Sequence, residues 1–275
     1  MRLAALVIAS LASLAARAEG PVCQPQPVKA SRFAAGEALG FKLDALGVDL
    51  GSFEVLTEPP PAADRPRAAL ALKSRARTTA FVSTNVGTYD AHATSLVDAN
   101  FAALRYREEV DEGPTHKAQE VDFPPLSGAL AVRATKNGDP DPFQLAAGPS
   151  ARDILSTLFL LRAQPMGRAF CVEVLAGRKL WRVQGQAAGR ETIETPLGRF
   201  ATLRVDATAV RADDPNIKRV AHVWVSDDAR RLPLVAIGEV KGRVIRAQLV
   251  SASGLGEKKQ ARTDHQRVGA AIGRR

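Results

Sequence analysis

Apolar and polar residues alternate over many short stretches of this chain, as they do in half-buried strands. In the clearest stretch, residues 202–210, the odd positions are all apolar and the even positions up to Thr208 are all polar. The same pattern, less cleanly, predicts strands over residues 40–46, 48–56, 68–77, 88–97, 101–110, 116–123, 129–135, 168–175, 179–186, 191–194, 219–225, 233–239 and 243–251.

Short turn segments separate these stretches. Asp98-Ala99-Asn100 predicts the turn of a hairpin, and Thr195-Pro196-Leu197-Gly198 predicts a turn between two strands. A dozen or so strands joined in this way exclude a parallel α/β fold, because parallel strands need long crossover connections. So long an antiparallel meander is expected to curl or close, which hides its edges.

One amphipathic helix is expected in the middle of the chain, over about residues 150–163. Ser150 is a plausible N-cap, and Asp153 lies near the positive end of the helix. Its apolar stripe contains Ile154, Leu155, Leu158, Phe159 and Leu161. The predicted fold is therefore mainly β: a single strongly curved antiparallel sheet, or open β-barrel, covered by this helix. Residues 79–86 predict one or two further helical turns.

The first residues predict a secretory signal peptide. Arg2 precedes an apolar run from Leu3 to Ala16, which is too short to span a bilayer, since a spanning helix needs about twenty apolar residues. Small residues at Ala16 and Ala18 place the cleavage after Ala18. A buried N-terminal helix is the alternative, and the uniformly apolar character of the run disfavours it.

We therefore expect four segments. They are a signal peptide over residues 1–18, a proline-rich lead over 19–32, one β-rich domain over 33–253 and a basic, disordered tail over 254–275. No later segment is long and apolar enough to cross a membrane. The expected location is periplasmic or secreted, without a transmembrane anchor.

Two cysteines, Cys23 and Cys171, are present. In an exported protein such a pair predicts one disulfide, and two unpaired thiols are the alternative. Cys23 follows Gly20-Pro21-Val22, which lacks both the small residue directly before the cysteine and the upstream leucine of a lipoprotein signal. A lipid anchor at Cys23 is therefore disfavoured.

The formal net charge is +9, and removing Arg2 and Arg17 with the signal peptide leaves +7. A basic chain can bind nucleic acid or an anionic surface. Aromatic residues make up only 5% of the chain, and no basic stretch is interleaved with them, so stacking on bases is disfavoured. We expect no nucleic-acid partner, and a lipid or another envelope component remains open as a partner.

No set of residues indicates an enzyme class. The four histidines are scattered without the spacing of metal ligands, so we expect neither a metal nor a cofactor. No serine lies between glycines at a strand–helix turn. Glu37 is expected to pair with an arginine such as Arg162, and His222 beside Trp224 on one strand face indicates packing more than ligand binding.

Five motifs follow one another along the chain: residues 33–37 (FAAGE) followed by Phe41 and 46–48 (LGV), 153–156 (DILS) running on to 161–162, 195–200 (TPLGRF), 223–228 (VWVSDD) leading into 232–234, and 241–243 (KGR). Their order and spacing resemble the bacterial family called domain of unknown function 3108. The resemblance implies an exported protein with a strongly curved sheet and few helices, and it brings no catalytic residues. A looser likeness to the periplasmic lipoprotein-localisation carriers concerns the fold alone.

Three functions are compatible with these observations. The leading hypothesis is a periplasmic binding or carrier domain for an apolar or amphipathic, lipid-like ligand. Its cavity would be lined by Ile154, Leu158, Phe159, Trp181 and Trp224. The alternatives are a structural or interaction protein of the cell envelope and an envelope hydrolase of unrecognised type.

Overall fold

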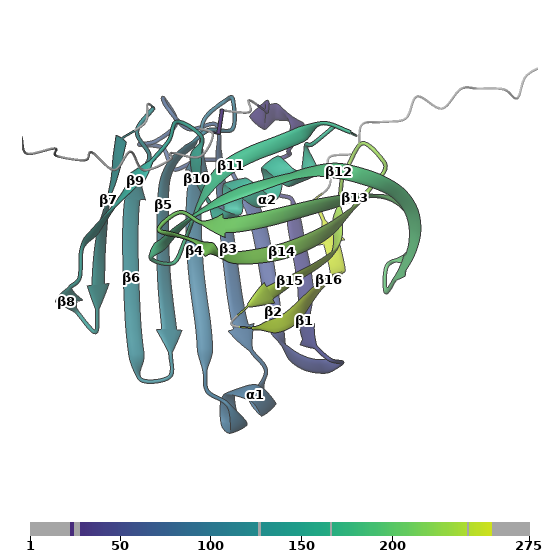
Figure 1. Cartoon of the computed structure of the whole chain (residues 1–275), viewed down its shortest axis with the longest axis horizontal. Helices are drawn as coiled ribbons and strands as arrows, with labels where there is room; N and C mark the ends of the chain where they lie inside the picture. Colours follow the sequence, from purple (N-terminus) through teal and green to yellow (C-terminus); the bar gives the residue numbers. More distant parts are fainter. Residues whose placement is uncertain (1–22, 25–27, 126–127, 166, 241, 255–275) are drawn as a thin grey trace, which may run out of the picture.

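The computed structural model describes residues 23–24, 28–125, 128–165, 167–240 and 242–254 (Figure 1). The expected signal peptide over residues 1–18 and most of the expected tail lie outside these residues. One curled sheet of 16 strands contains nearly all of the regular structure. Figure 1 shows it folded over itself, with β1–β7 behind, β11–β16 in front and helix α2 between them. The predicted curved, mainly β fold is confirmed.

The strands follow one another along the chain almost as they do in the sheet. Their order is β10-β11-β12-β13-β14-β15-β16-β1-β2-β3-β4-β5-β6-β7-β8, and β9 also pairs with β7. The bounds are β1 (Ala38–Ala45), β2 (Val48–Glu58), β3 (Leu70–Thr78), β4 (Tyr89–Val97), β5 (Ala103–Glu112), β6 (Thr115–Asp122), β7 (Gly128–Lys136), β8 (Asp139–Pro140), β9 (Phe143–Ala147), β10 (Ala151–Asp153), β11 (Ala169–Ala176), β12 (Lys179–Thr195), β13 (Gly198–Arg211), β14 (Asp214–Ser226), β15 (Pro233–Val240) and β16 (Arg243–Ser253).

The sheet stays open because its two end strands do not pair with each other. At one end β9 pairs with β7, and at the other β10 pairs with β11 in the sheet's one parallel ladder among the described residues. β9 and β10 are nevertheless neighbours in the chain, separated by Gly148, Pro149 and Ser150. The strands at both ends are short, which limits the backbone groups that are left unpaired.

Helix α2 (Ile154–Arg162) packs into the curl against β3, β4, β10 and β11. Its Phe159 is fully buried and meets the rings of Phe33 and Phe101 at centroid distances of 4.9 Å and 5.9 Å. The other helices of the described residues are α1 (Ala80–Asn85), in the predicted position, and a single 3-10 turn over Ala30–Arg32. Aromatic packing therefore fills the part of the curl next to α2.

Two local predictions are wrong. The helix does not start at Ser150: residues 151–153 pair with β11, and Asp153 is the N-cap, because its carboxylate accepts a hydrogen bond from the Ser156 amide at 2.9 Å. The strands expected over residues 179–186 and 191–194 are one long strand, β12. A register shift between Ala187 and Gly189 lets β12 bend there and keep its ladder with β13.

The predicted disulfide is present. Cys23 and Cys171 are bonded and lie 148 residues apart in the sequence, so the bond fastens the start of the described chain to β11. Among the described residues, no helix is long and apolar enough to cross a membrane.

Candidate functional site

The inner face of β2–β7 is organised in rows of side chains that run across the strands. The first row, next to α2, is completely buried, with every member at 2% exposure or less. Its members, matched by strand register, are Thr57, Leu72, Ser95, Tyr106, Val121 and Val132. At this level the interior is closed.

The second row lies two residues further from α2 on each strand. Apart from Val55 at its start, its members are partly exposed, and three of them are small. In register they are Val55, Ser74, Ala93, Glu108, Gln119 and Ala134. The interior thus changes from sealed to partly open within one row.

The third row continues the inner face toward α1. Its members are Phe53, Ala76, Ala91, Val110 and Lys117. Phe53 packs on Phe41 of the core at 5.9 Å between ring centroids and stays partly exposed. The second and third rows together combine small and apolar side chains with Glu108, Gln119 and Lys117, and we take this surface as the candidate site. We call it the inner-face site.

A carboxyl group lies within this surface. Glu108 accepts a hydrogen bond from the Gln119 amide at 2.5 Å. Burial raises the pKa of Glu108 above its ordinary value and the charge of Asp153 adds to this, whereas hydrogen bonds from Gln119 and Tyr106 act in the opposite direction. Burial and the charge of Glu108 likewise raise the pKa of the Tyr106 hydroxyl. The site thus combines apolar side chains with an acid, an amide and, in the third row, Lys117.

A buried ion pair fixes the closed end. The guanidinium of Arg162 binds both carboxylate oxygens of Glu37, at 2.5 Å and 3.1 Å, as the sequence predicts. It also donates to the carbonyl oxygens of Arg230 and Arg231, and it lies over the rings of Phe33 and Phe159.

A second polar group holds the start of α2. The Asp153 carboxylate, fully buried, accepts hydrogen bonds from the hydroxyls of Ser95 at 2.7 Å and Ser156 at 2.9 Å. Because Ser95 belongs to β4, this group ties the helix directly to the sheet. Ser156 therefore has a structural role at the N-terminus of the helix.

The five residues predicted to line a cavity lie in different surroundings. Phe159 is in the core and Leu158 packs against it, whereas Ile154 is 50% exposed. The ring of Trp181 lies under the guanidinium of Arg219, at 4.6 Å. Trp224 packs against the core, and its indole donates to Glu191 at 2.7 Å. Its ring is 6.2 Å from that of His222, consistent with the predicted packing.

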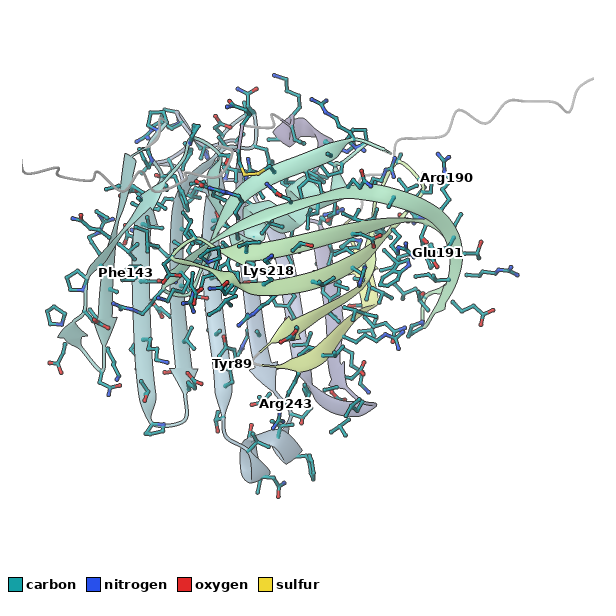
Figure 2. The ribbon with its side chains drawn as sticks, viewed as in Figure 1. Tyr89, Phe143, Arg190, Glu191, Lys218 and Arg243 are labelled. Carbon is teal, nitrogen blue, oxygen red and sulfur yellow. A yellow bond between two sulfur atoms is a disulfide. The ribbon has the colours of Figure 1, made fainter. Side chains whose placement is uncertain are left out.

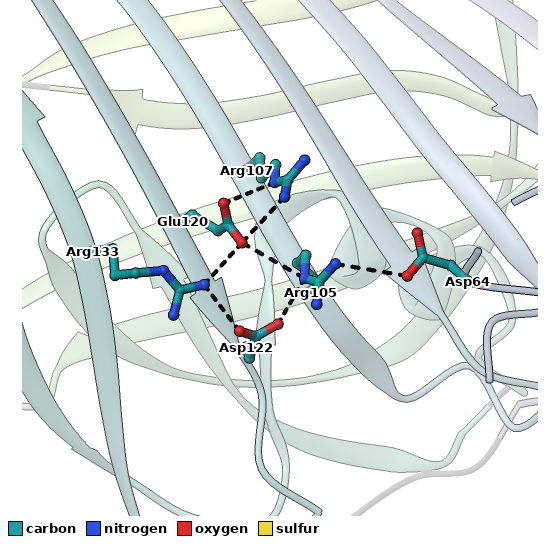
Figure 3. Close-up of polar contacts among 6 residues, drawn as sticks. All are labelled: Asp64, Arg105, Arg107, Glu120, Asp122 and Arg133. Atoms are coloured by element: carbon teal, nitrogen blue, oxygen red, sulfur yellow. Dashed lines mark hydrogen bonds and ion pairs between the residues drawn. The ribbon is translucent and has the colours of Figure 1, made fainter. Parts of the chain in front are cut away.

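The outer face has a different chemistry from the inner one. Figure 3 shows Arg105, Arg107 and Arg133 interleaved with Glu120 and Asp122 across β5, β6 and β7, and Asp64 from the loop between β2 and β3 pairs with Arg105. Burial raises the pKa of the Asp122 carboxyl, but hydrogen bonds from Arg105 and Arg133 outweigh it, and the net pKa lies below the ordinary value. These charges neutralise one another in register, so the network forms a solvated wall.

Two open grooves lie on the surface. One, of about 400 Å³, runs over β1–β4 and β16 and is lined by Gly40, Glu54, Arg75 and His92. The other, of about 740 Å³, lies over β11–β14 beside the disulfide and is lined by Gln184, Gln186, Asp206 and Thr208. In the described part of the chain, no group of three or more His, Cys, Asp or Glu residues could hold a metal ion.

Sequence reasoning missed the inner-face site. One signal was available: in the strand predicted over residues 101–110, Glu108 has the same parity as Tyr106 and Val110, so an acid falls on the apolar face. The cross-strand partner Gln119 could not be found in this way, because the register between two strands is not written in either one alone.

The comparisons concern family and fold. A family model described as "Protein of unknown function (DUF3108)" matches residues 41–243. No curated protein matches the chain. A β-barrel-like protein of the domain of unknown function DUF1849 from Brucella abortus is similar in structure, with a TM-score of 0.53 and 8% identity over 79% of this chain and 97% of that one.

A protein described as exported, with a YmcC-like fold, from Bacteroides fragilis aligns with a TM-score of 0.36 and 9% identity over 80% of this chain and 96% of that one. That score is too low to carry an argument. At 8% identity the Brucella likeness shows the fold alone.

Proposed function

The chain belongs to the DUF3108 family of proteins of unknown function, and we propose that it is a binding or carrier domain of the cell envelope for an amphipathic, lipid-like ligand. The observation that carries this proposal is the step in burial between the first and second rows of the inner face. The first row is sealed, and the second is partly exposed although it lies inside the curl.

The side chains of the second and third rows suit an acyl chain. Ala76, Ala93 and Ala134 are short and partly exposed, so a ligand that covers them would replace solvent. Covering apolar surface yields roughly 25 cal/mol per Å². A linear aliphatic chain lying along the strands would bury apolar surface in each row that it covers.

The polar pair in the second row suits the other part of such a ligand. Glu108 and Gln119 are hydrogen-bonding groups held among apolar neighbours, an arrangement that fixes the orientation of a bound molecule. Because the pKa of Glu108 is raised, its protonated form persists to a higher pH than that of an exposed glutamate. A protonated Glu108 donates a hydrogen bond to a ligand carbonyl or hydroxyl oxygen.

The disulfide supports a site of action outside the cytoplasm. Structural disulfides persist in oxidising compartments such as the bacterial periplasm and are rare in the cytosol. The bond between Cys23 and Cys171 therefore agrees with the export that the first eighteen residues predict. The ligand class follows from this location as well, since acyl chains are the main apolar material of an envelope.

The first test is to isolate the protein with whatever it carries. The precursor is expressed in a bacterial host, the mature protein is recovered from the periplasm without detergent, and native mass spectrometry is combined with lipid extraction. One acyl-chain molecule per protein is the expected result. The bare mass of the oxidised chain, together with failure to bind an added fatty acid, would contradict the proposal.

A further inference from the structure

Two projections at one end of the sheet expose apolar side chains. One is the turn between β1 and β2, where Leu46 is 99% exposed and Val48 is 49% exposed. The other is α1 with its C-cap, where Phe81 is 65% exposed and Val86 is 79% exposed. Together we call these four residues the apolar tips.

Hydrogen bonds join the two projections. Thr79, the N-cap of α1, donates from its amide to the carbonyl of Leu50 at 3.0 Å and from its hydroxyl to the carbonyl of Asp49 at 3.3 Å. These bonds fasten α1 to the start of β2, just after the β1–β2 turn. Val82 faces inward and is buried, which leaves Phe81 outside.

Leu46 is unfavourable for folding in two ways. Its φ is +51° and that of Gly47 is +83°, as in a two-residue type I′ hairpin turn. Asparagine is the residue that prefers the first of these positions, because its short side chain tolerates positive φ, whereas leucine is strained there. The leucine side chain also gains no contact, since almost all of it faces solvent. Neither property helps the fold, and a backbone outlier of this kind points to function.

We propose that the apolar tips insert into a lipid surface. They are two separate convex projections, and a fluid layer can receive both at once, whereas a protein partner would need a matching pocket for each. The lysine nearest this turn, Lys42, has its charge paired with Asp49 at 3.1 Å. We therefore expect insertion driven by apolar contact, with weak dependence on salt.

The position of the tips agrees with this partner. Going along the strands from α2, the rows pass from sealed to partly exposed and then reach the end that carries α1 and the β1–β2 turn (Figure 1). In Figure 2, Tyr89, the first residue of β4, and Arg243, the first of β16, lie toward this same end. A lipid surface bound by the tips would face the partly open side of the inner-face site. The inference does not depend on the ligand proposal.

The test is flotation of the purified mature protein with vesicles of phosphatidylethanolamine and phosphatidylglycerol, and with vesicles of phosphatidylcholine alone. Leu46→Asn places the preferred residue in the turn, so the fold is retained while the apolar side chain is lost. We expect about a tenfold weaker partition of this variant, since burying a leucine is worth roughly that factor or more. Adding Phe81→Gln to Leu46→Asn should weaken the partition into vesicles further. The two kinds of vesicle should rank the variants in the same order.

The matched control is Leu197→Asn. Leu197 lies in the turn between β12 and β13, is 38% exposed and also precedes a glycine. Figure 1 shows the end of β12 curving to a different part of the molecule from α1. The partition of Leu197→Asn should equal that of the unchanged protein. Equal partition of the Leu46→Asn and unchanged proteins would overturn the proposal. The proposal would also be overturned if the unchanged protein were a dimer in the absence of vesicles and the Leu46→Asn variant a monomer, because the tips would then bind a second copy of the chain.

Ala93→Phe separates this inference from the ligand proposal. The substitution fills the second row and leaves the tips unchanged, so it should leave vesicle binding intact. If the Ala93→Phe variant lost vesicle binding and the Leu46→Asn variant bound vesicles as well as the unchanged protein, lipid would reach the inner face without the tips, and this inference would be wrong.

Discussion

Arg162 at the end of α2 and Glu37 before β1 form a two-point ion pair across 125 residues of sequence, and both side chains are at 6% exposure or less. The pair joins the helix to the strand that lies in the middle of the sheet order. Two carbonyl oxygens and two aromatic rings complete the surroundings of the guanidinium. The closed end of the interior therefore depends on a charge that has little access to water.

Removing the carboxylate should be costly. Glu37→Gln leaves the Arg162 charge buried without a counterion, and we expect the free energy of unfolding to fall by about 3–5 kcal/mol. Urea denaturation monitored by tryptophan fluorescence measures this. Arg133→Ala is the surface comparison, because Arg133 is 61% exposed and its pairs are solvated, so its loss should cost about 1 kcal/mol or less.

The double variant Glu37→Gln with Arg162→Met tests whether the unpaired charge of Arg162 causes this loss of stability. It removes both charges and keeps the volume of the helix side chain, so much of the stability lost in Glu37→Gln should return. If the double variant is no more stable than Glu37→Gln, the buried charge is not the cause of the loss.

The disulfide should contribute strongly to stability. Cys23 and Cys171 close a loop of 148 residues, and in the chain-entropy model such a loop is worth about 4–5 kcal/mol. Replacing both cysteines by serine should lower the urea midpoint and raise the slope of unfolding, because the denatured chain without the cross-link exposes more surface. The unchanged protein under dithiothreitol should move to the same midpoint. Equal midpoints for oxidised and reduced protein would refute this contribution.

Glu108 should make stability depend on pH. Its pKa is raised in the folded state from the ordinary value of 4.5, so the folded protein binds this proton more tightly than the unfolded chain. Stability from this group is therefore present at low pH and is lost as pH rises from about 4.5 through the folded-state pKa. Glu108→Gln lacks this loss and should be the more stable protein at pH 8.

The check is urea denaturation of both proteins at intervals between pH 4 and pH 8. The difference between them should grow with pH. A difference that stays constant, or that shrinks toward pH 8, would mean that the folded-state pKa of Glu108 is not raised.

The curved sheet can be predicted from the sequence, whereas the inner-face site cannot. Alternation identifies most strands. The bond between Cys23 and Cys171 was predicted because two cysteines in an exported chain usually form a disulfide, and an acid such as Glu37 is expected to pair with an arginine. The start of α2 was misplaced because Ser150 and Asp153 both suit an N-cap, and only the pairing of residues 151–153 with β11 decides between them. The bend in β12 similarly depends on its long ladder with β13.

The five residues predicted to line a cavity differ from those of the inner-face site, and that cavity stays a prediction. It was based on large apolar side chains such as Phe159 and Trp181, whereas the proposed inner-face site contains small ones such as Ala93 and Ala134. Alanines are common on strands and give no signal by themselves. Their position in one row is a property of the register of six strands, which local patterns do not fix.

The inner-face site is tested most directly by titrating a fluorescent fatty acid, dansylated undecanoic acid, into the delipidated mature protein and two alanine-to-phenylalanine variants. Ala93→Phe fills the second row, and Ala118→Phe adds the same ring to the outer face of β6. We predict saturable binding to the unchanged protein and to Ala118→Phe, and binding weakened about tenfold or more in Ala93→Phe, with all three proteins cooperatively folded in urea denaturation. Equal affinity in both variants, or no saturable binding to any of the three, would contradict the account.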